Sequence, residues 1–277
     1  MRAAAAPPMS RNAIPSADPD GEILTRREGA VFLIGINRPQ KLNGFTPKML
    51  KELAAAYTAF EHDPQARVGL LYAEGQHFTA GLDLPKVAPL MGQKNLLAEP
   101  GQIDPCNNVP PFRSKPLVAA VQGITYTIGI ELMLAADIVV AASDCRFSQL
   151  EVKRGIMATG GATIRMVERA GWGHAMRYLL TGDEFDVATA LRLEFVQEVA
   201  EPGGQFDAAM KIAQTIAAQA PLAVAATLRN ARLALEHGPA AAVADFHETQ
   251  KMLMASEDVK EGIASFVEKR AANFKGR

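Results

Sequence analysis

The sequence predicts an α/β protein with a helical C-terminal region. Short, strongly apolar segments alternate with helical patterns through the first two thirds of the chain, which is typical of α/β proteins. Beyond residue 206 the pattern is helical almost throughout. The 277 residues, 48% hydrophobic and 21% charged, are enough to bury a sizeable core. We therefore divide the chain into a tail (1–21), an α/β core (22–205) and a helical C-terminal region (206–277).

The N-terminal tail is rich in Ala and Pro and is predicted to be disordered. It lacks the continuous apolar stretch of a secretory signal. Its arginines and scarcity of acids leave a targeting segment open as an alternative. The expected location is the cytoplasm, with the mitochondrial matrix as the second possibility.

The first half of the core contains three predicted strands and one helix. Residues 22–38 indicate two strands joined by a turn at Glu28 and Gly29. A helix follows, with Thr46 as its N-cap and Pro47 at its first position. Residues 67–74 form a buried strand that leads to a turn at Gly81. The segment 85–113 has weak periodicity and is predicted to be loop and short helix.

The second half repeats the alternation of strand and helix. Residues 116–123 and 137–142 are apolar strands, and a helix that begins near Gly129 lies between them. Asp137 stands at the junction of this helix and the next strand, which indicates a structural role. Further helices are expected at 171–182 and 185–196, and three more from residue 206 to residue 255.

Composition excludes several classes of protein. Lys and Arg number 29 against 30 Asp and Glu, so the chain lacks the basic surface expected of a nucleic-acid-binding protein. No apolar run approaches the ~20 residues that span a bilayer. Cys106 and Cys145 stand far apart, without the spacing of a disulfide framework or a zinc site. We therefore expect no nucleic acid, no membrane and no metal among its partners.

Familiar catalytic motifs are absent from the sequence. Residues 155–162, "GIMATGGA", have the spacing of a phosphate loop but lack its lysine and its serine or threonine. No GxSxG occurs, which excludes a serine-hydrolase elbow. The five histidines are scattered and are interpreted as surface or packing residues.

Two glycine turns and two acids remain as a candidate site. The turns, at Gly81 and Gly129, could direct backbone N–H groups at a developing negative charge. Glu131 lies in an apolar stretch at the start of a helix, and Glu151 follows 20 residues later. Two carboxyl groups in one site could donate a proton and activate water. The alternative is that both acids are incidental, with Glu131 stabilised simply by its helix dipole.

Five ordered blocks resemble the enoyl-CoA hydratase/isomerase family, also called the crotonase superfamily. The resemblance covers about residues 22–277. The blocks are "INRPQKLNGFTPKMLKEL", "HFTAGLDL", "KPLVAAVQGITYTIGIELMLAADIVVAASDCRFSQLEVKRGI", "LTGDEFDVATAL" and "KEGIASFVEKRAANFK". The resemblance implies a spiral of ββα units, followed by a helical C-terminal region that forms trimers or dimers of trimers.

The resemblance also implies roles for individual residues. Glu131 and Glu151 match the two catalytic glutamates of the hydratases. The backbone N–H groups of Leu82 and Ile128 match the oxyanion hole. The remaining matches are to CoA- or substrate-binding positions, and they are Lys41, Leu42, Thr79, Ala80, Gly81, Asp83, Leu84, Gly129, Phe266 and Lys269. Phe266 and Lys269 often serve a neighbouring subunit in the family. In the second turn, Thr127 and Ile128 stand where the family is commonly glycine-rich.

The activity implied by the resemblance is the syn addition of water to a trans-2-enoyl-CoA. CoA is then part of the substrate, and no separate cofactor is expected. A Δ3,Δ2-enoyl-CoA isomerase is the alternative enzyme, because it needs only one base. Other acyl-CoA enzymes of the superfamily also stay open. An acyl-CoA-binding protein without efficient turnover is the alternative from a different class.

Overall fold

The largest element of the fold is a six-stranded, mostly parallel sheet. The computed structural model describes residues 16–93 and 96–277. The strand order is β1-β2-β3-β4-β6-β9, and only the β1–β2 pair is antiparallel. The bounds are β1 Glu22–Glu28, β2 Val31–Asn37, β3 Val68–Ala73, β4 Leu117–Val121, β6 Ile138–Ala142 and β9 Glu198–Ala200. These bounds confirm the strands predicted from the sequence, namely the two N-terminal strands and those at 67–74, 116–123 and 137–142.

Both faces of this sheet are covered, which explains the apolar runs in its central strands. Every residue of β2 and β3 is buried. One face packs against α1 (Pro47–His62) and α3 (Ile128–Ala135). The other face packs against α7 (Gln205–Ala217) through Phe206, Ala209, Met210 and Ala213. Successive strand residues such as Leu33 and Ile34 therefore enter different apolar cores.

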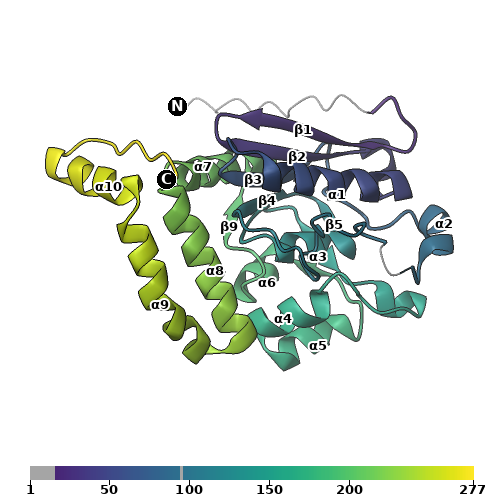
Figure 1. Ribbon diagram of the computed structural model, residues 1–277. Helices are drawn as coiled ribbons and strands as arrows, with labels where there is room; N and C mark the ends of the chain where they lie inside the picture. The colour runs from purple at the N-terminus through teal and green to yellow at the C-terminus, as the bar shows by residue number, and fades with distance from the viewer. Residues whose placement is uncertain (1–15, 94–95) are drawn as a thin grey trace, which may run out of the picture.

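A second, three-stranded sheet lies beside α3 (Figure 1). It consists of β5 (Ile124–Tyr126), β7 (Arg146–Ser148) and β8 (Phe185–Asp186). The β5–β7 pair is parallel and the β7–β8 pair is antiparallel. Residues 185–196, predicted as one helix, divide into β8, the short helix α6 (Val187–Arg192) and a buried turn. Phe185 stacks on Phe147, so tertiary packing overrides local helix propensity there.

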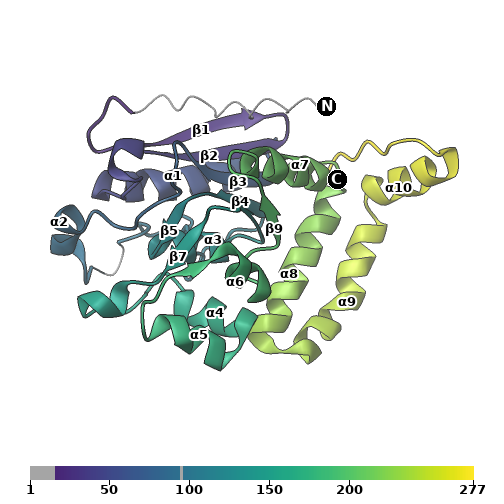
Figure 2. The same cartoon turned by 180° about the vertical axis from the view of Figure 1, so that it is seen from behind.

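The remaining helices complete the core and build the C-terminal region. α2 (Leu84–Val87), α4 (Ala162–Ala170) and α5 (Trp172–Leu179) belong to the core. Single 3-10 turns occur at Pro39–Lys41, Ala88–Leu90 and Glu151–Arg154. α8 (Pro221–His237), α9 (Pro239–Met254) and α10 (Glu257–Glu268) extend away from the sheets, as both views show (Figures 1 and 2). The predicted helical region thus contains one helix that covers the sheet and three that project.

Part of the predicted tail lies outside the described residues, namely 1–15. The last six residues of the tail, 16–21, pack against the core. Pro19 and Asp20 accept hydrogen bonds at their carbonyls from Arg38 Nε (2.9 Å) and Thr46 Oγ1 (2.8 Å). The predicted N-cap is confirmed, because the Thr46 side chain accepts from the Met49 N–H. Among residues 16–93 and 96–277, no helix is long and apolar enough to cross a membrane.

Candidate active site

The first turn of the site follows β3, and hydrogen bonds fix the residues on both sides of Leu82. Gly81 has a φ of 112°, a conformation that suits glycine. Its N–H donates to Thr79 Oγ1 (3.0 Å), and its carbonyl accepts from the Phe45 N–H (2.9 Å). The Asp83 N–H donates to the Phe45 carbonyl (2.8 Å). Between these fixed points, the Leu82 N–H has no acceptor in the described part of the chain.

The second turn joins β5 to α3 and contains a strained residue. Thr127 has φ 51° and ψ −118°, the first central position of a type II′ turn, which glycine normally fills. This conformation costs a β-branched residue ~1–3 kcal/mol. The Thr127 carbonyl accepts from the N–H groups of Ile130 and Glu131, so the strained residue begins the helix. The N–H of Ile128, at the first position of α3, has no acceptor within the described residues.

The two turns touch each other at two points. A Cβ atom added to Gly81 would collide with the Thr127 side chain, so that side chain fills the space above Gly81. A Cβ atom added to Gly129 would lie 2.7 Å from Thr79 Cγ2. Glycine at 81 and 129 therefore permits the close approach of the turns. The structure thus brings together the turns that carry the Leu82 and Ile128 N–H groups, as the resemblance implied.

Glu131 is buried and accepts backbone hydrogen bonds. Its Oε1 accepts from the Gly160 N–H at 2.6 Å and from the Ala162 N–H at 3.4 Å. Burial raises the pKa of this carboxyl, while the two N–H groups and the Arg165 guanidinium oppose the rise. A side chain on Gly160 would collide with the Glu131 carboxylate. In "GIMATGGA", the N–H groups of Gly160 and Ala162 therefore bind a carboxylate of this same chain at the start of α4.

Glu151 lies in a different environment. It begins a 3-10 turn and is half-buried. Its Oε2 is buried and has no hydrogen-bond partner among residues 16–93 and 96–277. Burial raises the pKa of Glu151 to about 7, its own backbone N–H lowers that pKa, and the charge of Glu131 raises it. The charge of Glu131 acts on the Glu151 carboxyl, so we treat the two groups as one candidate site.

The loops predicted to bind CoA lie together beside the first turn. The Ala80 N–H donates to the Leu42 carbonyl at 2.9 Å, which joins the segment around Lys41 to the segment around Gly81. Leu42 adopts the left-handed conformation and is exposed. Asp83 forms a 2.9 Å ion pair with Arg38, whose guanidinium also donates to the Gly44 carbonyl. This buried arginine, which the sequence did not single out, fixes both loops.

Two further residues predicted to bind CoA lie elsewhere in this chain. Phe266 lies on α10 and Lys269 follows at its C-cap, in the region that projects from the core. The Phe266 side chain is 84% exposed. The structure therefore does not bring Phe266 or Lys269 to the Glu131 and Glu151 site of the same chain. The resemblance placed their family counterparts on a neighbouring subunit.

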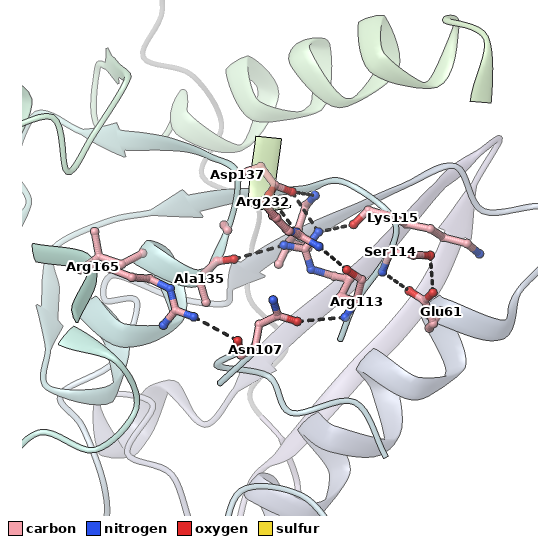
Figure 3. A network of polar contacts seen from close by, with 12 residues as sticks. Glu61, Asn107, Arg113, Ser114, Lys115, Ala135, Asp137, Arg165 and Arg232 are labelled. Atoms are coloured by element: carbon pink, nitrogen blue, oxygen red, sulfur yellow. Dashed lines mark hydrogen bonds and ion pairs between the residues drawn. The ribbon is translucent and has the colours of Figure 1, made fainter. Parts of the chain in front are cut away.

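A network of charged groups supports the helix that carries Glu131 (Figure 3). Arg113 is fully buried, and its guanidinium donates to Asp137 Oδ2 (2.9 Å) and to the Ala135 carbonyl at the end of α3 (3.1 Å). Arg232 of α8 donates to Asp137 Oδ1 at 3.2 Å and to the Arg113 carbonyl. The structural role expected for Asp137 is confirmed. The network also ties the projecting helices to the core.

Arg165 extends this support to the Glu131 carboxylate. It donates to the carbonyls of Cys106 (2.7 Å), Asn107 (3.2 Å) and Gly160 (3.3 Å), and Asn107 Oδ1 accepts from the Arg113 N–H. The Cys106 thiol and the Glu131 carboxylate both border the space beside Gly160, and burial raises the pKa of Cys106 well above its ordinary value. Cys106, Gly160 and Arg165 are site residues that the sequence did not reveal, because their contacts join distant segments.

The candidate site thus combines two features. Two backbone N–H groups from adjacent turns have no acceptor among the described residues, and two carboxyl groups lie in contrasting environments. A family model described as enoyl-CoA hydratase/isomerase matches residues 26–277. The chain belongs to the enoyl-CoA hydratase/isomerase family, and its fold is the crotonase fold.

Individual relatives cover nearly the whole chain. The 2,3-dehydroadipyl-CoA hydratase of Escherichia coli is 31% identical over 258 residues, which are 92% of this chain and 99% of the relative. A probable enoyl-CoA hydratase of Rhizobium meliloti is 33% identical over 92% of this chain and 98% of the relative. A crystal structure of a probable enoyl-CoA hydratase/isomerase from Mycobacterium abscessus is 49% identical. It matches 92% of this chain and 98% of its own with a TM-score of 0.89.

Proposed function

We propose that this protein is an enoyl-CoA hydratase that adds water to trans-2-enoyl-CoA thioesters. The observation that carries the proposal is the contrast between the two carboxyl groups of one site. Glu131 faces two backbone N–H donors, whereas Glu151 has a buried oxygen without a partner in the described part of the chain and a pKa raised to about 7. Such a pair can hold one carboxyl ionised and the other protonated. The hydratase names of the relatives support the same assignment.

In this mechanism the ionised Glu131 accepts a proton from the water molecule. The water oxygen forms a bond with C3 of the enoyl group, and the electron pair of the double bond moves toward the thioester carbonyl. The N–H groups of Leu82 and Ile128 stabilise the resulting enolate oxygen. Protonated Glu151 then donates its proton to C2, which restores the carbonyl. The proton on Glu131 passes to Glu151 before the next turnover, so the net addition is one water molecule and no cofactor is needed.

The test is the hydration of crotonyl-CoA, followed by the loss of the conjugated enoyl-thioester absorbance. We expect fast loss with the wild-type protein and an equilibrium mixture with 3-hydroxybutyryl-CoA. A 3-enoyl-CoA is assayed in parallel, since an isomerase would convert it to the conjugated thioester. Conversion of 3-enoyl-CoA without hydration of crotonyl-CoA would contradict the proposal and favour the isomerase. Binding without either reaction would favour an acyl-CoA-binding protein.

We also propose that the protein is a homo-oligomer, a trimer or a dimer of trimers, that assembles through its projecting helices. Ile263, Phe266 and Val267 of α10 are 58%, 84% and 73% exposed, which is a large apolar surface for one short helix. Assembly would cover this surface and could carry Phe266 and Lys269 to the CoA site of a neighbour. Light scattering of the purified protein measures the mass, and a monomeric mass would contradict this assignment.

A further inference from the structure

Thr127 combines two unfavourable features at one position. It lies in the second of the two turns that carry the Leu82 and Ile128 N–H groups, which we call the oxyanion turns. It is a β-branched residue at φ 51° and ψ −118°, where glycine is the normal choice. Its hydroxyl oxygen is buried and has no hydrogen-bond partner in the described part of the chain. Strain of this kind persists where the surrounding structure imposes it, and it often marks a functional constraint.

The position of the Thr127 side chain indicates what that constraint is. Its Oγ1 lies in the space that a side chain at 81 would occupy, and its Cβ and Cγ2 lie at ordinary contact distances of 3.5 and 3.6 Å from that space. Gly81 directly precedes Leu82, and Thr127 directly precedes Ile128. The contact between Thr127 and Gly81 therefore joins the residues that directly precede the two N–H groups without an acceptor within residues 16–93 and 96–277. The three described atoms nearest to that space all belong to Thr127.

We propose that Thr127 is a positioning residue whose side chain is a spacer between the two oxyanion turns. This inference rests on the proposed function, because it assigns the spacing of the hole to one side chain. The proposal assigns this role to the shape of the side chain, since its hydroxyl oxygen is buried and forms no hydrogen bond among the described residues. The Thr127 backbone is itself held, because its N–H donates to the Ser148 carbonyl at 2.9 Å.

The spacer matters because an oxyanion hole requires accurate distances. Each donor must lie about 2.7–3.1 Å from the developing charge, and a misplacement of about 1 Å can cost up to ~10²-fold in rate. With glycine at 127, the turn would lose its strain, and the space above Gly81 would be empty. The Leu82 and Ile128 N–H groups would then be free to shift relative to each other.

The test compares Thr127→Gly with Thr127→Val. Valine keeps the branched shape and the strain but removes the hydroxyl, so it is the conservative variant that should restore function. We expect Thr127→Gly to lower kcat for crotonyl-CoA about 10-fold or more, with a smaller change in KM, while its melting temperature stays equal or rises. We expect Thr127→Val to retain kcat within about threefold. A merely structural role would instead lower activity and stability together.

A binding measurement separates the spacer from the proposed function. A cinnamoyl-CoA with a para-dimethylamino group absorbs at longer wavelength when its carbonyl is polarised, and this shift needs no turnover. We expect a red shift with the wild type and with Thr127→Val, and a reduced shift with Thr127→Gly. If the wild type and Thr127→Val shift the probe more than Thr127→Gly does, but the wild type hydrates no enoyl-CoA, the spacer stands and the proposed function fails.

The opposite outcomes overturn the spacer. Hydration by Thr127→Gly at the wild-type rate, or equal red shifts in all three proteins, would show that the side chain does not set the hole. A wild-type protein that binds the probe without any red shift would have the same meaning. If Thr127→Val were as slow as Thr127→Gly, the hydroxyl would be the essential group, and the spacer would be wrong.

Discussion

The surroundings of Glu131 and Glu151 differ in the number of donors that face each carboxylate. Glu131 is buried at the start of α3 and meets the N–H groups of Gly160 and Ala162. Glu151 is half-buried in a 3-10 turn, and one of its oxygens is buried without a partner among the described residues. Burial raises the pKa of both groups, but only Glu131 has two N–H donors from another segment that oppose the rise. Two glutamates of the same chain can therefore have opposite tasks because their donors differ.

The largest expected effect comes from removing the acid of the pair. Glu151→Gln keeps the size of the side chain but cannot donate a carboxyl proton to C2. We expect kcat for hydration to fall at least about 10³-fold, since acid–base residues contribute up to ~10⁴. Steady-state kinetics with crotonyl-CoA measure the loss. Glu168→Gln, on the exposed side of α4, is the matched control and should retain wild-type activity.

The second largest effect on kcat is expected from Glu131→Gln. The amide oxygen can still accept from the Gly160 and Ala162 N–H groups, so the pocket should keep its shape. The amide cannot take a proton from water, and kcat should fall about 10²-fold. The melting temperature should change little, because a neutral isostere replaces a buried charge. Hydration by either glutamine variant at the wild-type rate would refute the two-glutamate mechanism.

The pH dependence of hydration by the wild type tests the difference between Glu131 and Glu151. Glu151 must be protonated to act as an acid, and its pKa is about 7. We therefore expect kcat/KM for hydration to fall as the pH rises above about 7. It should also fall in acid as Glu131, whose pKa is raised by burial, is protonated. A kcat/KM that stays constant between about pH 6 and about pH 9 would contradict the role of Glu151. Buffers of constant ionic strength are needed for the measurement.

The same raised pKa makes a prediction about stability. In the folded protein Glu151 binds its proton more tightly than a carboxyl with the ordinary pKa of 4.5. The stability that this proton confers is present below pH 4.5 and is lost as the pH rises through about 7. Glu151→Gln should therefore gain stability relative to the wild type across this range, while it loses activity. Denaturant unfolding at about pH 4.5 and about pH 8 tests the sign.

The smallest expected effect concerns the support beneath Glu131. Arg232→Met removes a mostly buried arginine that bonds Asp137 and the Arg113 carbonyl, and it should cost ~1–3 kcal/mol of unfolding free energy. Arg229→Met is the matched control on the same helix. Arg229 pairs with Asp245, its side chain is 56% exposed, and its loss should cost under ~1 kcal/mol. Equal losses would mean that the network does not join α8 to the core.

The sequence predicted the fold well where local patterns decide the structure. The apolar runs that became β2, β3, β4 and β6 are buried on both faces of a parallel sheet, and Thr46 is the N-cap expected for α1. Residues 185–196 were the exception. Their helical pattern is real, but the packing of Phe185 on Phe147 pulls the first two residues into a strand.

The site was predicted only in part, because much of it depends on contacts between distant segments. Glu131 and Glu151 stood out as acids in apolar or glycine-rich surroundings. A hydrogen-bond donor to Glu131, however, is a backbone N–H 29 residues away, and no side-chain pattern in the sequence predicts it. Arg38, Arg113 and Arg165 were missed for the same reason, since surface and buried arginines look alike in a sequence. The glycines at 81 and 129 suggested that the two turns lie close together, but only the structure gives the geometry of their approach.

The close contact between Gly129 and Thr79 limits the order in which this site can evolve. Alanine in place of Gly129 would favour the helix, but its Cβ would lie 2.7 Å from Thr79 Cγ2. Serine in place of Thr79 removes that methyl group and keeps the hydroxyl that bonds the Asn43 carbonyl and the Gly81 N–H. A lineage that changes Thr79 first can therefore accept Gly129→Ala afterwards. A lineage that changes Gly129 first must shift Thr79 or the turn beside it, so the reverse order carries the larger structural cost.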